Sequence, residues 1–185
     1  MVNLVRSSID PRWLEVQENG QVVQEVEVHF PLYKIPRSFP SVEEALRWLR
    51  ETERKQAKGR AYRLISSRSY PSTVLFEKLR EKGYAEPLCQ EIVQELQQLG
   101  YVQDEEFVVR MIEREFARGV GPRLIEMKIQ CKGLKSDSVR QYISEARQKD
   151  MIRRLSSKLK LERRKKIQTL ARKGFDLEIL LNEIR

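Results

Sequence analysis

The 185-residue sequence contains few of the residues that build metal and cofactor sites. It has one histidine, His29, and two cysteines, Cys89 and Cys131, which lie far apart and form no C-x-x-C pair. One histidine and two distant cysteines do not make a zinc site of the usual kind. Both cysteines fall inside helical patterns, so we expect reduced thiols that are buried or half-buried. The sequence therefore predicts no metal site and no cofactor.

Motifs for catalysis are also missing. No G-x-x-x-x-G-K-[ST] loop is present, which excludes a nucleotide cradle of the P-loop type. The Gly-Val-Gly stretch at 119–121 is too short for a dinucleotide loop and lies between predicted helices. A Ser–His–Asp triad would have to use His29, which falls in a predicted strand far from any candidate nucleophile. We therefore expect no enzymatic activity.

The sequence has no long apolar segment. No run of about 18 apolar residues could span a membrane, and the first residues lack the pattern of a signal peptide. We therefore expect a soluble, cytoplasmic protein. Only eight Gly and seven Pro argue against a fibrous or low-complexity chain, and a hydrophobic content of 40% is enough for one or two small folded domains.

Positive charge is plentiful, and it is concentrated toward the end of the chain. The net charge of +9 favours polyanionic partners such as nucleic acid or a nucleoprotein. The counts of Lys plus Arg against Asp plus Glu are 8 and 9 over residues 1–57, 7 and 8 over 58–106, 10 and 6 over 107–150, and 11 and 4 over 151–185. A polyanion should therefore meet the C-terminal half.

The N-terminal region predicts a β-hairpin. Residues 12–36 are rich in β-forming residues, part of which alternate with period two. Asn19 and Gly20 form the dipeptide that a type I′ turn favours, because both central residues need a positive φ. The following Pro31 and Pro36 make that segment an edge or a loop.

The rest of the chain predicts helices. Ser41 and Glu44 have the spacing of a capping box, so a helix should begin near residue 42 and continue into the mid-50s. From residue 58 on, apolar residues recur with the helical period, and glycines stand just past the last periodic residue, where a C-cap is expected. The glycines that we expect to end helices are Gly83, Gly100, Gly133 and Gly174. Tyr84 and Tyr101 follow two of them and should pack back onto the last turn of the preceding helix, with base stacking as the alternative.

The helical part is internally repeated. Residues 68–84 match 118–134 after a shift of fifty positions, with apolar residues in register. Such self-similarity is typical of repeat proteins. We predict a mainly α fold: three tandem three-helix repeats in an elongated array, preceded by a short β-hairpin and a connecting helix. The predicted domains are the hairpin and helix at 1–57, the first repeat at 58–103, the second at 104–149, and a shorter, strongly basic third at 150–185.

A helix of the second repeat carries a row of arginines. Arg110, Arg114 and Arg118 are spaced by four and should share one face. One interpretation is a solvated face on which Glu106, Glu113 and Glu115 offset part of the repulsion. The other is a surface that meets phosphate or an acidic protein, because the excess of cations continues along the chain. The cations that form our candidate binding surface are Arg110, Arg114, Arg118, Arg123, Lys128, Arg153, Arg154, Lys158, Arg163, Arg164, Lys165, Arg172 and Lys173.

The basic segment 158–174 is amphipathic and could lie on a membrane surface. Inside a repeat, however, its apolar face is already used for packing, so we expect no membrane binding. Contact with about five to eight phosphates would make the affinity fall steeply with ionic strength. No helix-turn-helix segment with base-reading residues stands out, so sequence-specific DNA recognition is the weaker alternative.

Three stretches of sequence resemble the RecX family of RecA regulators. They are LGYVQDEEF at 99–107, RGVGPRLIEMKIQCKGL at 118–134 and EKLREKGY at 77–84. The resemblance covers residues 58–185 and extends more loosely over the N-terminal hairpin and helix. The chain departs from the family pattern at Pro71 and Val74, where a Ser cap and a Glu are usual, and in its short, very basic last repeat.

The resemblance implies a function by binding. RecX-like proteins are helical arrays that lie along the groove of the RecA–ATP–DNA filament and inhibit its recombinase, ATPase and coprotease activities, which connects them with homologous recombination, DNA repair and the SOS response. It thus implies a monomeric, non-catalytic RecA inhibitor that also contacts single- or double-stranded DNA without sequence preference. Binding to several filament subunits at once would add to its affinity. The alternative is a non-specific basic DNA-binding protein that acts without RecA.

Overall fold

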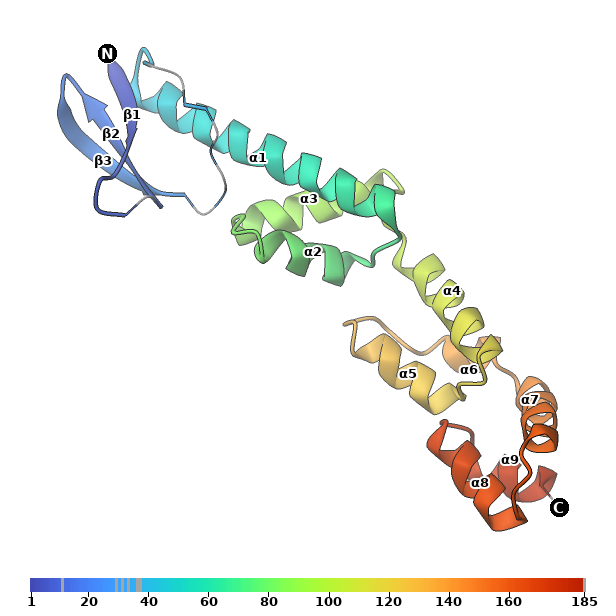
Figure 1. The fold of residues 1–185 in the computed structure, drawn as a ribbon. Helices are drawn as coiled ribbons and strands as arrows, with labels where there is room; N and C mark the ends of the chain where they lie inside the picture. The colour runs from blue at the N-terminus through green and yellow to red at the C-terminus, as the bar shows by residue number, and fades with distance from the viewer. Residues whose placement is uncertain (11, 29, 31, 33, 36–37, 185) are drawn as a thin grey trace. The chain divides into compact units, whose positions relative to one another are not determined.

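The computed structural model describes residues 1–185 except 11, 29, 31, 33, 36–37 and 185. The chain forms two compact units, residues 1–102 and 103–185, and each unit has its own hydrophobic core. Among the described residues, the strands lie in the first unit, and helices make up the second (Figure 1). None of the described helices combines the length and the apolar character that crossing a membrane requires.

The first unit begins with a three-stranded antiparallel sheet. Its strands are β1 (Val2–Arg6), β2 (Trp13–Glu18) and β3 (Gln21–Glu27), in the order β1-β2-β3. Asn19 and Gly20 form the turn between β2 and β3 and have φ angles of 51° and 84°, as a type I′ turn requires. The predicted hairpin is confirmed. The sheet also contains β1, which we did not predict and which pairs with β2 along its whole length.

Helix α1 (Val42–Ser67) packs against β1 and β2. Its first turn is capped as predicted, because the Glu44 amide donates a hydrogen bond of 3.2 Å to the Ser41 hydroxyl. We expected two helices over this stretch, but the structure has one of 26 residues. Ala57 and Ala61 in its polar middle are fully buried, so tertiary packing holds a segment whose sequence alone looked like a solvated connector. Our expectations for His29, Pro31 and Pro36 lie outside the described residues.

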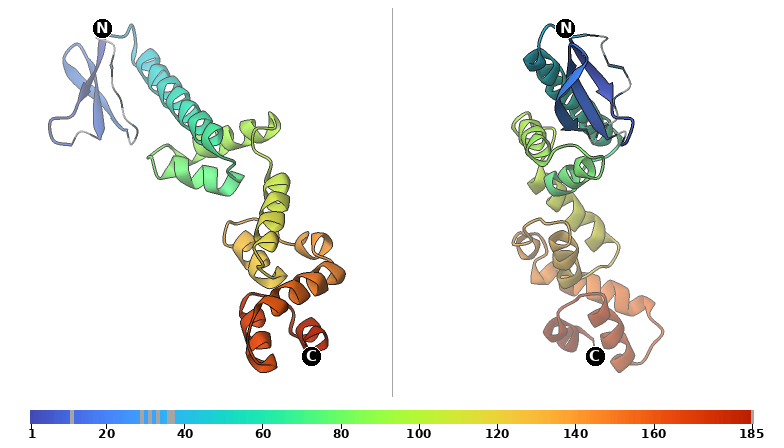
Figure 2. Two further views of the ribbon diagram at one scale, coloured as in Figure 1. Left: turned by 45° about the vertical axis from the view of Figure 1, so that its right-hand side comes forward. Right: turned by 90° about the vertical axis from the view of Figure 1, so that its left-hand side faces the viewer.

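The helices pack in groups of three, and the predicted mainly helical repeat fold is confirmed. The two views of Figure 2 show the successive groups within their units. Two predicted domain boundaries fall inside helices, since α1 runs through 57/58 and α7 begins before residue 150. The four-part division of the chain stays a prediction. The groups are α1, α2 (Ser72–Arg80) and α3 (Glu86–Gln98); α4 (Asp104–Ala117), α5 (Pro122–Gln130) and the single turn α6 (Val139–Tyr142); and α7 (Glu145–Lys158), α8 (Arg163–Arg172) and α9 (Leu177–Glu183).

The second and third groups meet through the backbone of two glycines. The Gly121 amide donates to the Lys173 carbonyl at 2.7 Å, and the Arg123 amide donates to the Gly174 carbonyl at 3.1 Å. A Cβ at Gly121 would lie 2.3 Å from the carbonyl carbon of Gly174, so only glycine permits this approach. Amides at the start of α5 thus bind the carbonyls of the two residues just past α8, which gives partners to groups that would otherwise lack them. The Gly-Val-Gly stretch therefore has a packing role.

Two expectations about single side chains need correction. Cys89 is buried as expected, and burial raises the pKa of its thiol to about 11. Cys131, however, is exposed, because it caps the C-terminus of α5 just beyond the last buried residue, Ile129. We also expected Tyr101 to pack back onto its own helix. It is 60% exposed instead and meets Tyr62 of α1 edge-to-face, with ring centroids 5.8 Å apart.

Candidate functional site

The cations selected from the sequence all lie in the second unit, and all are exposed. Their side chains fall into two groups according to what they contact. The partnered cations, which form an ion pair or a hydrogen bond with another protein group, are Arg110, Arg114, Arg118, Arg123, Lys128, Arg153 and Arg163. The unpartnered cations, whose side chains have no such partner in the described part of the chain, are Arg154, Lys158, Arg164, Lys165, Arg172 and Lys173.

Three partnered cations converge on one buried carboxylate. Glu115 of α4 has only 6% of its surface exposed. It accepts a hydrogen bond from Lys128 of α5, with a distance of 2.5 Å from Nζ to Oε2. Arg114 and Arg118 of α4 approach its other oxygen at 3.2 and 3.4 Å. The hydrogen bond from Lys128 is the main cause that lowers the pKa of Glu115. This carboxylate therefore stays charged and ties α5 to α4.

The arginine row on α4 is confirmed as an exposed face, but its members are not free. Arg110 pairs with Glu106 at 3.1 Å, and the other two arginines share Glu115. We also expected Glu113 to offset the row. It binds Arg147 of α7 instead, at 2.9 Å, and this hydrogen bond lowers the pKa of Glu113.

The other partnered cations hold the third helix group together and join it to α5. Arg123 of α5 pairs with Asp176 at 3.0 Å, and Arg153 of α7 pairs with Glu183 of α9 at 2.7 Å. Arg163 donates to the carbonyls of Leu181 and Ile184 at 3.2 and 2.7 Å. It thereby satisfies carbonyl groups at the C-terminal end of α9. These three cations have an evident structural role.

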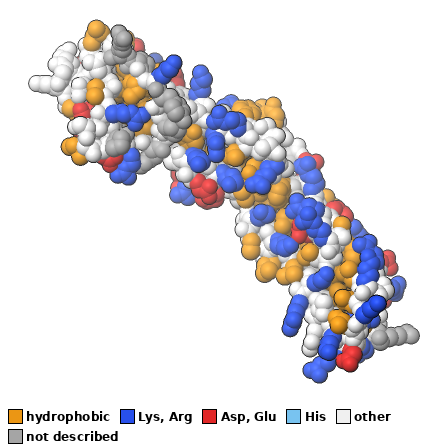
Figure 3. Space-filling view, in the orientation of Figure 1, with side chains coloured by type: hydrophobic (Ala, Val, Ile, Leu, Met, Phe, Trp, Pro, Cys, Tyr) orange, Lys and Arg blue, Asp and Glu red, His pale blue; other side chains and the backbone are white. Residues whose placement is uncertain are grey.

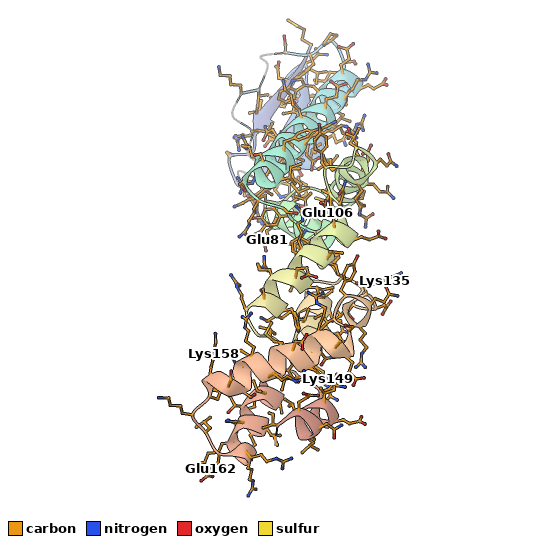
Figure 4. The ribbon with its side chains drawn as sticks, turned by 90° about the vertical axis from the view of Figure 1, so that its right-hand side faces the viewer. Glu81, Glu106, Lys135, Lys149, Lys158 and Glu162 are labelled. Carbon is orange, nitrogen blue, oxygen red and sulfur yellow. The ribbon has the colours of Figure 1, made fainter. Side chains whose placement is uncertain are left out.

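The unpartnered cations lie on the outer faces of α7 and α8. Arg154 and Lys158 are four residues apart on α7 and share a face. Lys165 and Arg172 project from the side of α8 opposite its buried Ile167 and Leu170, and Arg164 lies at the flank, three residues before Ile167. Figure 3 shows many blue and few red side chains over this part of the second unit. In Figure 4, Lys158 marks the end of α7 and Glu162 the start of α8.

The first turn of α8 is electrostatically unfavourable on its own. It consists of four successive cations at 163–166, and no acidic residue lies in that turn. The positive end of the helix dipole lies at the same place, where it repels cations and attracts anions. Carbonyl groups accept hydrogen bonds from Arg163, whereas its three neighbours have no such acceptors among the described residues. An external anion at this turn would relieve the repulsion.

We did not predict that Glu115 is buried and binds three cations. We treated it as a surface carboxylate that offsets the arginine row, although it stands four residues after Met111 and three after Ile112, both of which are buried. This spacing places it on the buried face of α4 and was the available signal. Lys160 and Lys166 were not selected either, and they too have no side-chain partner among the described residues.

No family model matches the sequence. Two similar curated proteins are both called regulatory protein RecX. The protein of Legionella pneumophila (strain Corby) is 32% identical over 83 residues, which are 45% of this chain and 55% of that protein. The protein of Geobacillus thermodenitrificans (strain NG80-2) is 27% identical over 139 residues, with coverages of 68% and 52%. The chain spans about half the length of these relatives.

Two solved structures share the fold. A crystal structure of regulatory protein RecX superposes with a TM-score of 0.68 at 17% identity and covers 99% of this chain and 98% of that one. The crystal structure of RecX from Lactobacillus salivarius gives a TM-score of 0.67 at 19% identity, with coverages of 72% and 96%. At these identities the likeness concerns the fold. In sequence the chain is thus similar to proteins called regulatory protein RecX, and it shares the fold of solved RecX structures.

Proposed function

We propose that the protein is a non-catalytic regulator that binds along the RecA–DNA nucleoprotein filament and inhibits the recombinase, ATPase and coprotease activities of RecA. The resemblance to regulatory proteins named RecX supports this proposal. The observation that supports a particular binding surface is the set of unpartnered cations on α7 and α8. A filament that contains DNA offers phosphates to such a surface.

The two units would meet different parts of the filament. Residues 1–102 contain 15 Lys and Arg against 14 Asp and Glu, whereas residues 103–185 contain 21 against 13. The second unit therefore suits a polyanion, and the nearly neutral first unit suits contact with protein. Several separate surfaces on one chain would also strengthen binding to a repetitive assembly, because each contact raises the effective concentration of the next.

All the candidate cations remain part of the proposed site, but they would contribute differently. An unpartnered cation that meets a phosphate releases a counterion, so its contribution is sensitive to salt. The charge of a partnered cation that contacts a carboxylate is already partly offset, so such a cation adds less to the salt dependence. Arg114, Arg118 and Lys128 would instead present a surface whose shape is held by Glu115.

RecA-dependent ATP hydrolysis on single-stranded DNA tests the proposal. The protein is titrated into preformed filaments, and the rate is measured against the ratio of protein to RecA. We expect inhibition well below one molecule per RecA protomer, since bridging or capping affects several subunits. Inhibition that appears only when the protein suffices to coat all DNA would support the alternative, a DNA-binding protein that acts without RecA. No inhibition at any ratio would refute the proposal.

Neutralising the α8 face tests the surface. The triple variant Arg164→Gln, Lys165→Gln, Arg172→Gln should bind the filament more weakly and lower the slope of log affinity against log salt by about 2, because three phosphate contacts at about 0.7 each are lost. The matched control is Arg50→Gln, Lys55→Gln, Arg63→Gln, which removes three exposed cations of α1. Equal loss in both variants would mean that net charge alone matters and that the α8 face is not the site.

A further inference from the structure

The outer edge of the N-terminal sheet is open. Strand β3 ends the order β1-β2-β3, and in the described part of the chain no segment pairs with its outer edge. The opposite edge is covered, since β1 bridges to Phe39 and lies against α1. Figure 1 shows β3 as the strand farthest from α1. Its side chains are exposed except for Val26, which is half-buried, and Val22 and Val23 are each 50% exposed.

One hydrogen bond indicates which backbone groups of β3 face outward. The Val28 amide donates to the Arg12 carbonyl at 2.6 Å. Hydrogen-bonded and non-hydrogen-bonded pairs alternate along an antiparallel ladder, and Glu25 lies opposite Glu15 in this register. Glu25 therefore belongs to a non-hydrogen-bonded pair, so its amide and carbonyl point away from β2. These are the groups that an added strand would use.

This edge is acidic in a protein that is otherwise basic. Residues 13–28 contain four glutamates and no Lys or Arg. Glu15 and Glu25 lie directly opposite each other, and side chains in a non-hydrogen-bonded pair are especially close. Like charges so placed destabilise a sheet. Neither carboxylate forms an ion pair within the described residues, and the one side-chain hydrogen bond to Glu15 comes from Gln17.

Open strand edges are usually blunted with lysine or proline, whereas this edge carries glutamate. A second copy of β3 or a nucleic acid would bring further negative charge to the Glu15–Glu25 pair. A strand with Lys or Arg beside these residues would neutralise it, and apolar residues between those cations would meet the half-buried Val26 side of the sheet.

We propose that the outer edge of β3 binds an extended protein segment with alternating basic and apolar side chains, which joins the sheet as a fourth strand. The backbone of Glu25 supplies hydrogen bonds, and the carboxylates of Glu15 and Glu25 select for cations. This inference does not depend on the proposed function, because it concerns a different surface and can be tested without RecA.

The test uses the full chain and labelled heptapeptides of sequence KVKVKVK and QVQVQVQ, with binding measured by fluorescence anisotropy; the comparison peptide is neutral because an acidic one would also meet the cations of the second unit. We expect the basic peptide to bind, the neutral peptide to bind at least about tenfold more weakly, and salt to weaken the binding of the basic peptide. The double variant Glu15→Gln, Glu25→Gln should remove most of the difference between the peptides. Equal binding of both peptides by the natural chain, or no binding of the basic one, would overturn the proposal.

A second pair of reagents tests strand addition itself. Glu25→Pro removes an outward-facing amide without removing a ladder bond to β2, and Glu25→Gln is its control because both variants lack the carboxylate. Binding by Glu25→Pro should fall about five- to tenfold below that of Glu25→Gln while circular dichroism stays unchanged. Basic peptides that are N-methylated either at every valine or at every lysine probe the same bonds without altering the protein. The amides of alternate residues in an added strand point to opposite sides, so only one of the two methylated sets would face β3. One methylated peptide should therefore bind much more weakly than the other. Equal binding of both would show that the basic peptide is held by charge alone.

Discussion

In each unit, one glutamate binds several cations and joins two helices, but the two units differ in how many cations are left without a carboxylate. In the first unit, Glu95 of α3 binds Arg54 and Lys58 of α1, and hydrogen bonding from Lys58 lowers the pKa of that carboxylate. In the second unit, Glu115 gathers cations from α4 and α5 in the same manner. The first unit has almost as many carboxylates as cations, whereas the second has far fewer. The second unit therefore has more cations than carboxylates that could pair with them. Internal pairing decides which of these cations are available to a partner.

The units also differ in how they tolerate a methyl group at a glycine. Gly121 in the second unit touches the backbone of Gly174, whereas a Cβ at Gly59 in α1 would meet nothing within 4 Å.

Both tryptophans, Trp13 and Trp48, lie in the first unit. Tryptophan fluorescence therefore reports on the first unit, and far-ultraviolet circular dichroism reports on the helices of both.

The largest effect should come from Gly121→Ala. The added methyl group would lie 2.3 Å from the backbone of Gly174, so α5 and α8 must separate and lose the hydrogen bonds between them. We expect the second unit to lose about 3 kcal/mol or more of stability. In thermal unfolding, the part of the helical signal that comes from the second unit should then be lost earlier, while the tryptophan transition stays in place. A simultaneous shift of both signals would show that the two units unfold together.

A smaller effect, again in the second unit, is expected for Glu115→Gln. The loss of charged hydrogen bonds to Lys128 and the arginines should cost about 1–3 kcal/mol at neutral pH. Because the pKa of Glu115 is lowered on folding, its contribution is complete above the unfolded value of about 4.3 and is lost as the pH falls through the lower folded value. Urea unfolding followed by circular dichroism should show the variant and the natural chain converging at acidic pH. A stability difference that stays constant down to pH 2 would contradict this role.

The smallest effect, with the opposite sign, should come from Gly59→Ala in the first unit. Position 59 lies inside α1 and has room for a methyl group, so alanine should stabilise the helix by about 0.5–1 kcal/mol. The tryptophan transition should rise slightly. A lower midpoint of the tryptophan transition would mean that α1 needs flexibility at this position. The space available for a methyl group would then not be enough to explain the difference from Gly121.

Local patterns in the sequence were sufficient for much of the fold. The Asn19–Gly20 turn, the Ser41 cap and the glycines that end helices depend on interactions within a few residues, and these can be recognised in a sequence. Strand β1 was missed because its five residues form a strand only by pairing with β2. The break predicted within α1 was wrong for a related reason, since Ala57 and Ala61 are held by distant parts of the core.

The helical repeat, the surplus of positive charge toward the C-terminus and the exposed position of the candidate cations could be predicted from the sequence, because periodicity and composition are properties of the chain. Which cations are partnered depends on the tertiary structure. Arg123 meets Asp176 and Arg153 meets Glu183 across 53 and 30 residues, and no local pattern specifies such pairs. The acidic open edge of β3 likewise emerged only from strand order and register, because a carboxylate becomes part of a binding surface through the neighbours that folding gives it.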